Sequence, residues 1–400
     1  MRRRYRDAAG VTLIEMMVAL VISMVLSIVV MLVLSTFEGR RRTISSGADL
    51  DQTGALAMFQ LDRWIRSAGS GLAQGSSYAY GCRLFAAKAG NQILPAPAAL
   101  PAPFASVNPG ASGVFRLAPI LILPGQTTPE VSGASSDVLV VMTAGNRASQ
   151  VPAPLLAPPA ADHLSTANLT EFAPSDLVLV ADRQQNTDGG PADCLVSQTA
   201  ASLPTTGAGT LLALGGTGDA YYAASVGTAA ITNFTDAAVA FDLGAASNAG
   251  GGQTPVFQLL GVGNHDTLYS YDLLQIDGNA AQAEAEGVFE MHAVYGVDAT
   301  GNANNQVDQW VDASATSAYS VAALTDGSAA AMGLLKNIRA VRVALILRTS
   351  LPEKDTVAPS ELALFPDLSG VARTRVLSAA ERHFRYRVVE TTIPVRNNAF

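Results

Sequence analysis

The feature that most constrains this chain is an apolar run near its start. Residues 11–37 contain one charged side chain, Glu15. About 20 consecutive apolar residues suffice for a helix to span the hydrocarbon core of a bilayer, so the run predicts a transmembrane helix. A carboxylate inside such a helix is costly unless something pairs with it, which makes Glu15 a candidate functional residue.

Basic clusters flank the run on both sides. The leader before it carries four arginines and the segment after it carries three: Arg2, Arg3, Arg4, Arg6, Arg40, Arg41 and Arg42. Basic segments beside a transmembrane helix tend to remain cytoplasmic, so the two clusters favour opposite orientations of the helix in the membrane. The free amino group and the additional arginine favour a cytoplasmic leader. This orientation predicts a body on the periplasmic side.

Three interpretations of the run compete. A simple signal anchor would leave Glu15 unexplained. A cleaved secretory signal has a shorter apolar core, followed by a small-residue cleavage site that is missing after residue 37. The third interpretation explains the order of the parts, because Gly10 stands directly before the apolar helix and Glu15 lies in its first turn.

This order resembles the class III signal of type IV prepilins and pseudopilins. The resemblance implies that a prepilin peptidase cuts between Gly10 and Val11 and then methylates the amino group of Val11. Most members of that family begin the mature chain with Phe, and this chain would begin with Val11. That departure bears on the efficiency of methylation more than on cleavage, which depends chiefly on the glycine.

The resemblance also implies a role for Glu15 in assembly. In the family's filaments, apolar helices pack side by side, and the carboxylate pairs with the methylated amino terminus of a neighbouring subunit. A buried ion pair of this kind sets the register between two helices. The alternative is that Glu15 is a tolerated polar residue near the membrane interface.

The helix is expected to continue beyond the membrane. Apolar residues at helical spacing between Leu50 and Ile65 form one stripe, and Gly54 is a point at which the helix could bend. Gly69 or Gly71 is expected to end the helix. Residues 61–69 are similar to the "L-x-R-x-I-R-x-A-G" segment that closes this helix in PilW-type minor pilins.

Two cysteines, Cys82 and Cys194, follow the predicted transmembrane helix. An oxidising periplasm and an even cysteine count favour a disulfide between them. In the chain-entropy model, closing so long a loop contributes about 4–5 kcal/mol to stability. The alternative is two free thiols in separate parts of the body.

The C-terminal third has the clearest pattern. Residues 284–298, 333–350 and 382–397 alternate between apolar and polar side chains, as in half-buried antiparallel strands. In this order the three blocks resemble the PilW segments "V-E-x-x-x-x-Y-G-x-D", "I-x-x-V-R-I-x-L-x-V-R-S" and "R-R-x-x-x-x-T-V-x-L-R-N". With the N-terminus, the resemblance covers about half of the chain. Residues 72–280 contribute little to it.

These inferences divide the chain into five segments. They are a cleaved leader (1–10), a transmembrane and polymerisation helix (11–37), an amphipathic continuation of that helix (38–71), a β-rich periplasmic body with Pro/Gly-rich loops (72–280) and a C-terminal antiparallel sheet region (281–400). The expected fold class is α+β and pilin-like. The long helix packs on an antiparallel sheet body with long loops.

Motifs for catalysis or metal binding are weak. The four histidines, His163, His265, His292 and His383, share no metal-ligand spacing, and His292 is expected to serve packing or to lie on the surface. Oxygen-bearing side chains at Asp298, Asn302, Asn304 and Asp308 alternate as in a calcium loop. The segment lacks the sixth-position Gly and the terminal Glu of such a loop. A hairpin turn is therefore the favoured interpretation, and calcium is the alternative.

The net charge argues against a nucleic-acid binder. The chain carries −8, and removing the leader's four arginines and one aspartate gives −11. Nucleic-acid-binding proteins show a basic patch instead. No catalytic residue and no cofactor is expected.

We therefore expect a minor pilin of a type IV pilus, at or near the tip. Its expected location is the inner membrane, with a single pass and a periplasmic body, and then the extracellular pilus. Expected partners are the prepilin peptidase, other minor pilins, the major pilin, the inner-membrane assembly platform and a tip adhesin. The alternatives are a minor pseudopilin of a type II secretion system and a membrane-anchored periplasmic enzyme.

Overall fold

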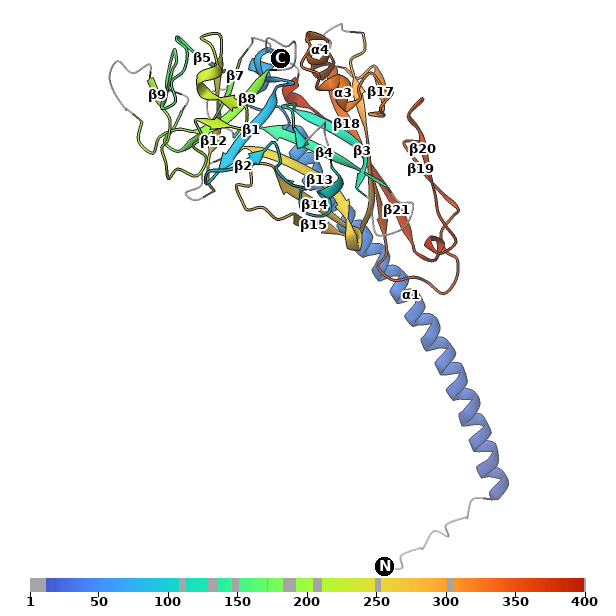
Figure 1. The fold of residues 1–400 in the computed structure, drawn as a ribbon. Coiled ribbons are helices and arrows are strands. Elements are labelled where there is room, and N and C mark those ends of the chain that lie inside the picture. Colours follow the sequence, from blue (N-terminus) through green and yellow to red (C-terminus); the bar gives the residue numbers. More distant parts are fainter. Residues whose placement is uncertain are drawn as a thin grey trace, which may run out of the picture. The chain divides into compact units, whose positions relative to one another are not determined.

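The computed structural model describes most of the chain and divides it into two compact units, Met1–Gln52 and Thr53–Phe400. The described residues are 12–107, 113–127, 135–145, 151–170, 172–182, 192–203, 211–248, 253–300 and 306–398. The leader cleavage site at Gly10 and Val11 lies outside them. The described part of the first unit is helical, and the second unit carries every strand that the structure describes (Figure 1).

One helix, α1 (Leu13–Ser67), begins at the apolar run and ends in the second unit. Its stretch Leu13–Ser35 is long and apolar enough to cross a membrane. The helix continues without interruption through Gly54, the point at which the sequence allowed a bend. Ser67 is its last residue, and Gly69 follows with a φ of 77°, a conformation that glycine adopts easily.

The second unit is built around three larger sheets. The six-stranded sheet has the order β2 (Asn91–Leu94), β1 (Arg83–Lys88), β8 (Asp193–Gln198), β7 (Asp176–Ala181), β12 (Val239–Ala245) and β5 (Ala153–Pro154). The five-stranded sheet has the order β15 (Gln282–Glu286), β14 (Thr267–Asp272), β13 (Val256–Gly263), β4 (Ser136–Thr143) and β3 (Ile120–Thr127). The four-stranded sheet has the order β17 (Gln309–Val311), β16 (Val288–Val297), β18 (Ile338–Arg348) and β21 (Tyr386–Pro394).

Smaller elements complete this unit. They are the strand pairs β10 (Ser225–Val226) with β11 (Ala229–Ala230), β19 (Glu361–Leu364) with β20 (Arg373–Val376), and β6 (His163–Ser165) with β9 (Leu211–Ala213), and the short helices α2 (Ser76–Ala79), α3 (Val321–Leu324) and α4 (Ala329–Asn337). Among the described strands, β1 and β8 pair in parallel and the other pairings are antiparallel. The expected α+β fold is therefore confirmed.

The Ser136-Asp137 dipeptide at the start of β4 joins two sheets. β17 pairs only with the end of β16 (Tyr295–Val297), and side chains of β4 bind the free edge of β16 further along.

The segment 358–383, which we call the flap, covers one face of the sheet formed by β16, β18 and β21. It contains β19, β20 and a 3₁₀ turn (Glu381–His383). Its apolar side chains form one buried cluster with those of the sheet; Phe289 and Ile346 from the sheet and Phe365 from the flap are fully buried. Arg342 also ties the flap to the sheet, because it pairs with Asp367 (2.7 Å) and Glu390 (2.8 Å).

The six-stranded sheet has a second apolar cluster, which includes Val178, Val180 and Leu195. Cys82 and Cys194 form a disulfide at this sheet, the pairing that the sequence favoured. The bond joins the residue before β1 to β8, beside the parallel contact between the two strands. The disulfide thus closes a covalent loop between two residues that are 112 positions apart in the chain.

Candidate assembly site

The start of α1 forms a reciprocal cap. The backbone N–H and the hydroxyl of Thr12 both donate to Oε2 of Glu15, at 2.9 and 3.0 Å, and the backbone N–H of Glu15 donates to Thr12 Oγ1 at 3.4 Å. This is a capping box, in which the side chain at the N-cap and the acid three residues later satisfy each other's backbone donors. Sequence reasoning missed this role of Thr12, although the spacing Thr-x-x-Glu before an apolar run is its known signal.

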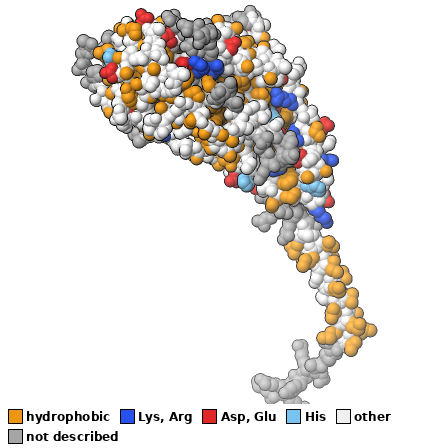
Figure 2. Space-filling view, in the orientation of Figure 1, with side chains coloured by type: hydrophobic (Ala, Val, Ile, Leu, Met, Phe, Trp, Pro, Cys, Tyr) orange, Lys and Arg blue, Asp and Glu red, His pale blue; other side chains and the backbone are white. Residues whose placement is uncertain are grey.

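The apolar stretch of α1 presents its side chains outward. Leu13–Ser35 comprises 23 residues with a mean hydropathy of 3.1, and none of its most apolar window is buried. Figure 2 shows apolar side chains over the surface of this part of the helix. A helix of this kind requires either lipid or other apolar helices around it. In the first unit, the described part therefore offers a surface for lipid or for other apolar helices.

The last turns of α1 pack on the body through one face. Ala57, Leu61 and Ile65 are fully buried. Gly54 allows a close approach, because a Cβ atom there would lie 2.6 Å from Cδ1 of Leu347 on β18. The glycine that was expected to weaken the helix thus serves helix–sheet packing.

The opposite face of these last turns of α1 carries two large apolar side chains that are exposed to solvent. Leu56 is 48% exposed and Phe59 is 64% exposed. They are three residues apart and therefore lie on one face of the helix.

The end of α1 is held by the end of the chain. Nδ2 of Asn397 lies 3.2 Å from the carbonyl oxygens of Ser67 and Ala68 and 3.4 Å from that of Arg66. These carbonyls belong to the last turn, where backbone acceptors lack helical partners. Two of the segments that resemble PilW, residues 61–69 and 382–397, therefore meet in space.

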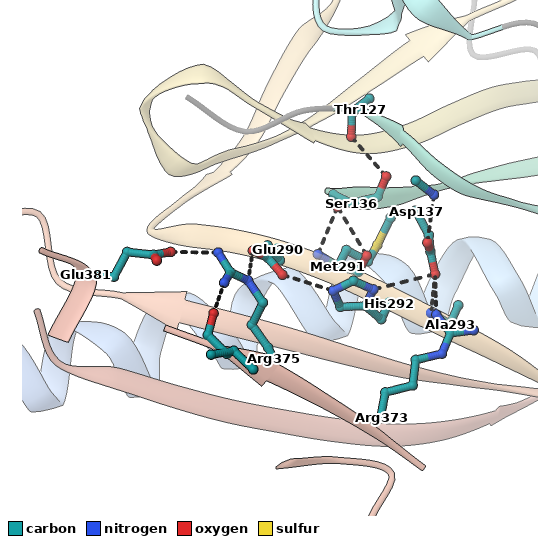
Figure 3. A network of polar contacts seen from close by, with 12 residues as sticks. Thr127, Ser136, Asp137, Glu290, Met291, His292, Ala293, Arg373, Arg375 and Glu381 are labelled. Carbon is teal, nitrogen blue, oxygen red and sulfur yellow. Dashed lines mark hydrogen bonds and ion pairs between the residues drawn. The ribbon is translucent and has the colours of Figure 1, made fainter. Parts of the chain in front are cut away.

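Figure 3 shows a polar cluster where β4 meets β16 and the flap. Ser136 Oγ donates to the carbonyl of Met291 (3.1 Å) and accepts its N–H (2.9 Å). Asp137 accepts the N–H of Ala293 at Oδ2 (3.0 Å) and that of Gly125 at Oδ1 (3.0 Å). These side chains satisfy the backbone of β16 where no strand pairs with it.

The centre of the cluster is a buried ion-pair chain. Glu290 is fully buried, and its Oε1 accepts a hydrogen bond from the Nε–H group of Arg375, with 2.6 Å between the two atoms. Nη2 of Arg375 also pairs with Glu381 at 2.6 Å. Burial lowers the pKa of Arg375, but the hydrogen bond and charge of Glu290, together with those of Glu381, raise this pKa above its ordinary value.

His292 takes part in the same cluster. Its Nε2 lies 3.0 Å from Oε2 of Glu290, its Nδ1 lies 3.8 Å from Oδ2 of Asp137, and Arg373 approaches the same oxygen at 3.9 Å. The residue expected to serve packing or to lie on the surface is thus part of a buried polar network. It connects β16 with β4 beneath the flap.

Only part of the candidate calcium loop is described. Asn302 and Asn304 lie outside the described residues. Thr300 donates hydrogen bonds to Asp298 (3.2 Å) and Asp308 (2.7 Å), and Asp298 lies 3.6 Å from Nη2 of Arg339. Asp298 and Asp308 therefore have partners in the protein, and within the described segments no group of three or more His, Cys, Asp or Glu side chains is arranged to hold a metal.

Two family models match the chain. The prokaryotic N-terminal methylation motif matches residues 5–34, which contain the capping box and most of the apolar stretch. The model of type IV pilus-assembly protein W, PilW, matches residues 260–397, which contain Arg375, Glu290 and Asn397. No curated protein and no solved structure matches the chain.

The helix, its methylation motif and the sheet body together support a type IV prepilin-like protein. Within that class, residues 260–397 are similar to PilW, which supports a PilW-type protein. Both matches support a structural role in a type IV pilus, and the apolar helix fits a pilin anchored in the inner membrane.

Proposed function

We propose that this protein is a minor pilin that is stored in the inner membrane, enters a type IV pilus at or near its tip, and helps to prime growth of the fibre. The observation that carries the proposal is the start of α1, where a capped carboxylate stands at the head of an exposed apolar helix. The two family matches support the same assignment.

The geometry of Glu15 supports its proposed use as a register residue. Both hydrogen bonds from Thr12 end on Oε2. Within the described part of α1, Oε1 has no hydrogen-bond partner and remains available to a cation. The cap directs the carboxylate toward the N-terminal end of the helix. The methylated amino terminus of an adjacent subunit, created at Val11 by cleavage after Gly10, supplies the matching charge.

The body would act through contacts rather than chemistry. The exposed face at Leu56 and Phe59 gives neighbouring subunits an apolar surface. Proposed partners are other minor pilins, the major pilin and a tip adhesin, with the prepilin peptidase and the inner-membrane assembly platform acting before incorporation.

A deletion strain tests the pilus assignment against a role in type II secretion. We expect loss of this protein to reduce the amount of surface fibres and to leave the activity of secreted enzymes in the medium unchanged. The chain itself should be found in sheared fibres at a small fraction of the major pilin. Normal piliation with a loss of secretion would overturn the proposal in favour of a pseudopilus subunit.

A further inference from the structure

The body contains a cavity that the assembly function does not use. Its volume is about 520 Å³. It lies between the second half of β3, at Leu123 and Pro124, and the α3 region, at Val321 and Ala322. Sites for small ligands have volumes of about 300–1,000 Å³ and mostly apolar walls with a few polar groups. This cavity has that size and that composition, with Arg116 and Asp326 among its lining residues.

Arg116 is held in the cavity wall by a rigid support. The backbones on both sides of it are hydrogen-bonded to the strand at the disulfide: the N–H of Leu84 donates to Phe115 O (2.9 Å), and the N–H of Leu117 donates to Cys82 O (3.0 Å). Phe115 and Leu117 are buried, with exposures of 1% and 0%. The backbone of Arg116 is thus held by packed neighbours on both sides.

The guanidinium has spare hydrogen-bonding capacity. It carries five N–H donors, and the described residues accept one hydrogen bond from it, from Nη1 to Gly81 O at 3.1 Å. Its neighbour across the strand pairing is Arg83, which is already paired with Asp193 at 2.6 Å. No ion pair of Arg116 occurs within the described ranges.

The electrostatic surroundings are unfavourable to this cation. Burial lowers the pKa of Arg116, and the positive charge of Arg83 lowers it further, while Asp193 and Asp326 act in the opposite direction. An anion bound beside the guanidinium would offset both unfavourable contributions.

We propose that the cavity binds a small monocarboxylate with an apolar body. The carboxylate pairs with the free N–H groups of Arg116, for which a two-point contact is the favoured geometry. The apolar body packs against Leu123, Pro124 and Val321. Asp326 also lines the cavity, and a carboxyl group there disfavours anions of higher charge; its Oδ1 accepts the N–H of Ser328 at 2.7 Å.

Calorimetric titration of the full-length chain in a non-ionic detergent tests this inference, with detergent alone as the blank. Phenylacetate is the probe. Phenylacetamide has the same shape without the charge, acetate has the charge without the apolar body, and inorganic phosphate carries more charge. We expect phenylacetate to bind and each of the other three to bind at least about tenfold more weakly, as the loss of a charge-assisted hydrogen bond or of apolar contact implies.

Two variants localise the binding. Arg116→Gln removes the charge, and Ala322→Trp fills the cavity from an exposed position on α3. Each should weaken phenylacetate binding about ten- to hundredfold, whereas Arg63→Gln, which changes an exposed arginine on α1, should leave it unchanged.

The inference is overturned if phenylacetate does not bind the wild-type chain at millimolar concentration, or if phosphate binds more tightly. It is equally overturned if Ala322→Trp binds phenylacetate as tightly as the wild type. That second variant decides the matter even if Arg116→Gln does not fold, since the side chain of Ala322 is an exposed methyl group.

Discussion

Glu15 and Glu290 are both carboxylates in apolar segments of this chain, but among the described residues only Glu290 has a cation as its partner. Glu290 is fully buried and pairs with Arg375, which in turn pairs with Glu381. Glu15 is exposed and accepts hydrogen bonds from Thr12. The buried carboxylate of the body therefore has its cation, whereas the described part of the chain supplies none to the carboxylate of the helix. This difference indicates where the molecule depends on a partner.

The largest effect on incorporation into fibres is expected at Glu15. Glu15→Gln keeps an oxygen that can accept the hydrogen bonds of Thr12 but removes the charge. Losing one partner of a buried ion pair costs about 3–5 kcal/mol, so incorporation into fibres should fall about 100-fold or more. Quantitative immunoblots of sheared fibres against membranes measure this ratio.

The matched control is Thr12→Val, which removes the hydroxyl of the cap and keeps the charge. It should reduce incorporation far less, because loss of a cap costs about 1 kcal/mol. The reverse order, with Glu15→Gln near wild type and Thr12→Val defective, would mean that Glu15 serves only as a helix cap.

The next effect concerns the covalent closure of the body. Replacing Cys82 and Cys194 together by Ala should lower the free energy of unfolding by about 4–5 kcal/mol, because the bridge spans 112 residues. Urea unfolding of the full chain in detergent measures the loss. Processing at Gly10 should be unaffected, since the bridge belongs to the body. An unchanged midpoint would show that the disulfide does not form in the protein.

Breaking the buried ion-pair chain should have a similar but somewhat smaller effect. Arg375→Met leaves Glu290 and Glu381 buried without their cation, at a cost of about 3–5 kcal/mol. Arg385→Met is the matched control, because its pair with Glu353 is about one-third exposed and should contribute at most about 1 kcal/mol. Adding Glu290→Gln to Arg375→Met should recover part of the loss. Equal losses in the two single variants would contradict the claim that the cluster under the flap matters more than a surface pair.

The smallest effect is a pH dependence at Asp272. Burial raises the pKa of this carboxyl to about 6, although the N–H groups of Ile276 and Leu274 lower it, against an ordinary value of 3.8. The folded state therefore holds this proton to a higher pH than the unfolded state, and its stabilisation is lost as the pH rises from about 4 to 6. The difference of about two units corresponds to at most about 3 kcal/mol.

Asp272→Asn removes this titration. Relative to the wild type, the variant should become more stable as the pH rises across that window, as thermal unfolding at pH 4 and pH 7 would report. A difference between the two proteins that does not change with pH would contradict a raised pKa.

The sequence predicted the parts of the fold that rest on local periodicity. The apolar run gave the start of α1, and the alternation in residues 284–298 and 382–397 gave β16 and β21. Residues 333–337 were expected to belong to a strand, but they complete α4 before β18 begins. A short apolar pair such as Leu334-Leu335 fits either conformation, so packing decided between them.

The contacts that define the candidate sites were harder to predict. Asp137 binds the backbone of Ala293 across 156 residues, and Asn397 caps α1 across about 330 residues. Residue spacing carries no information about such pairs. The capping box at Thr12 is the exception, because its signal lies within four residues.

The N-terminal mass of the chain, isolated from membranes and from sheared surface fibres, tests the central claim most directly. The account predicts a mature chain that begins at N-methylated Val11 in both fractions. In Gly10→Ala, it predicts an uncut chain in the membrane and none in the fibres. A wild-type chain that begins at Met1 and occurs only in the membrane would contradict it and leave a protein held by a simple signal anchor.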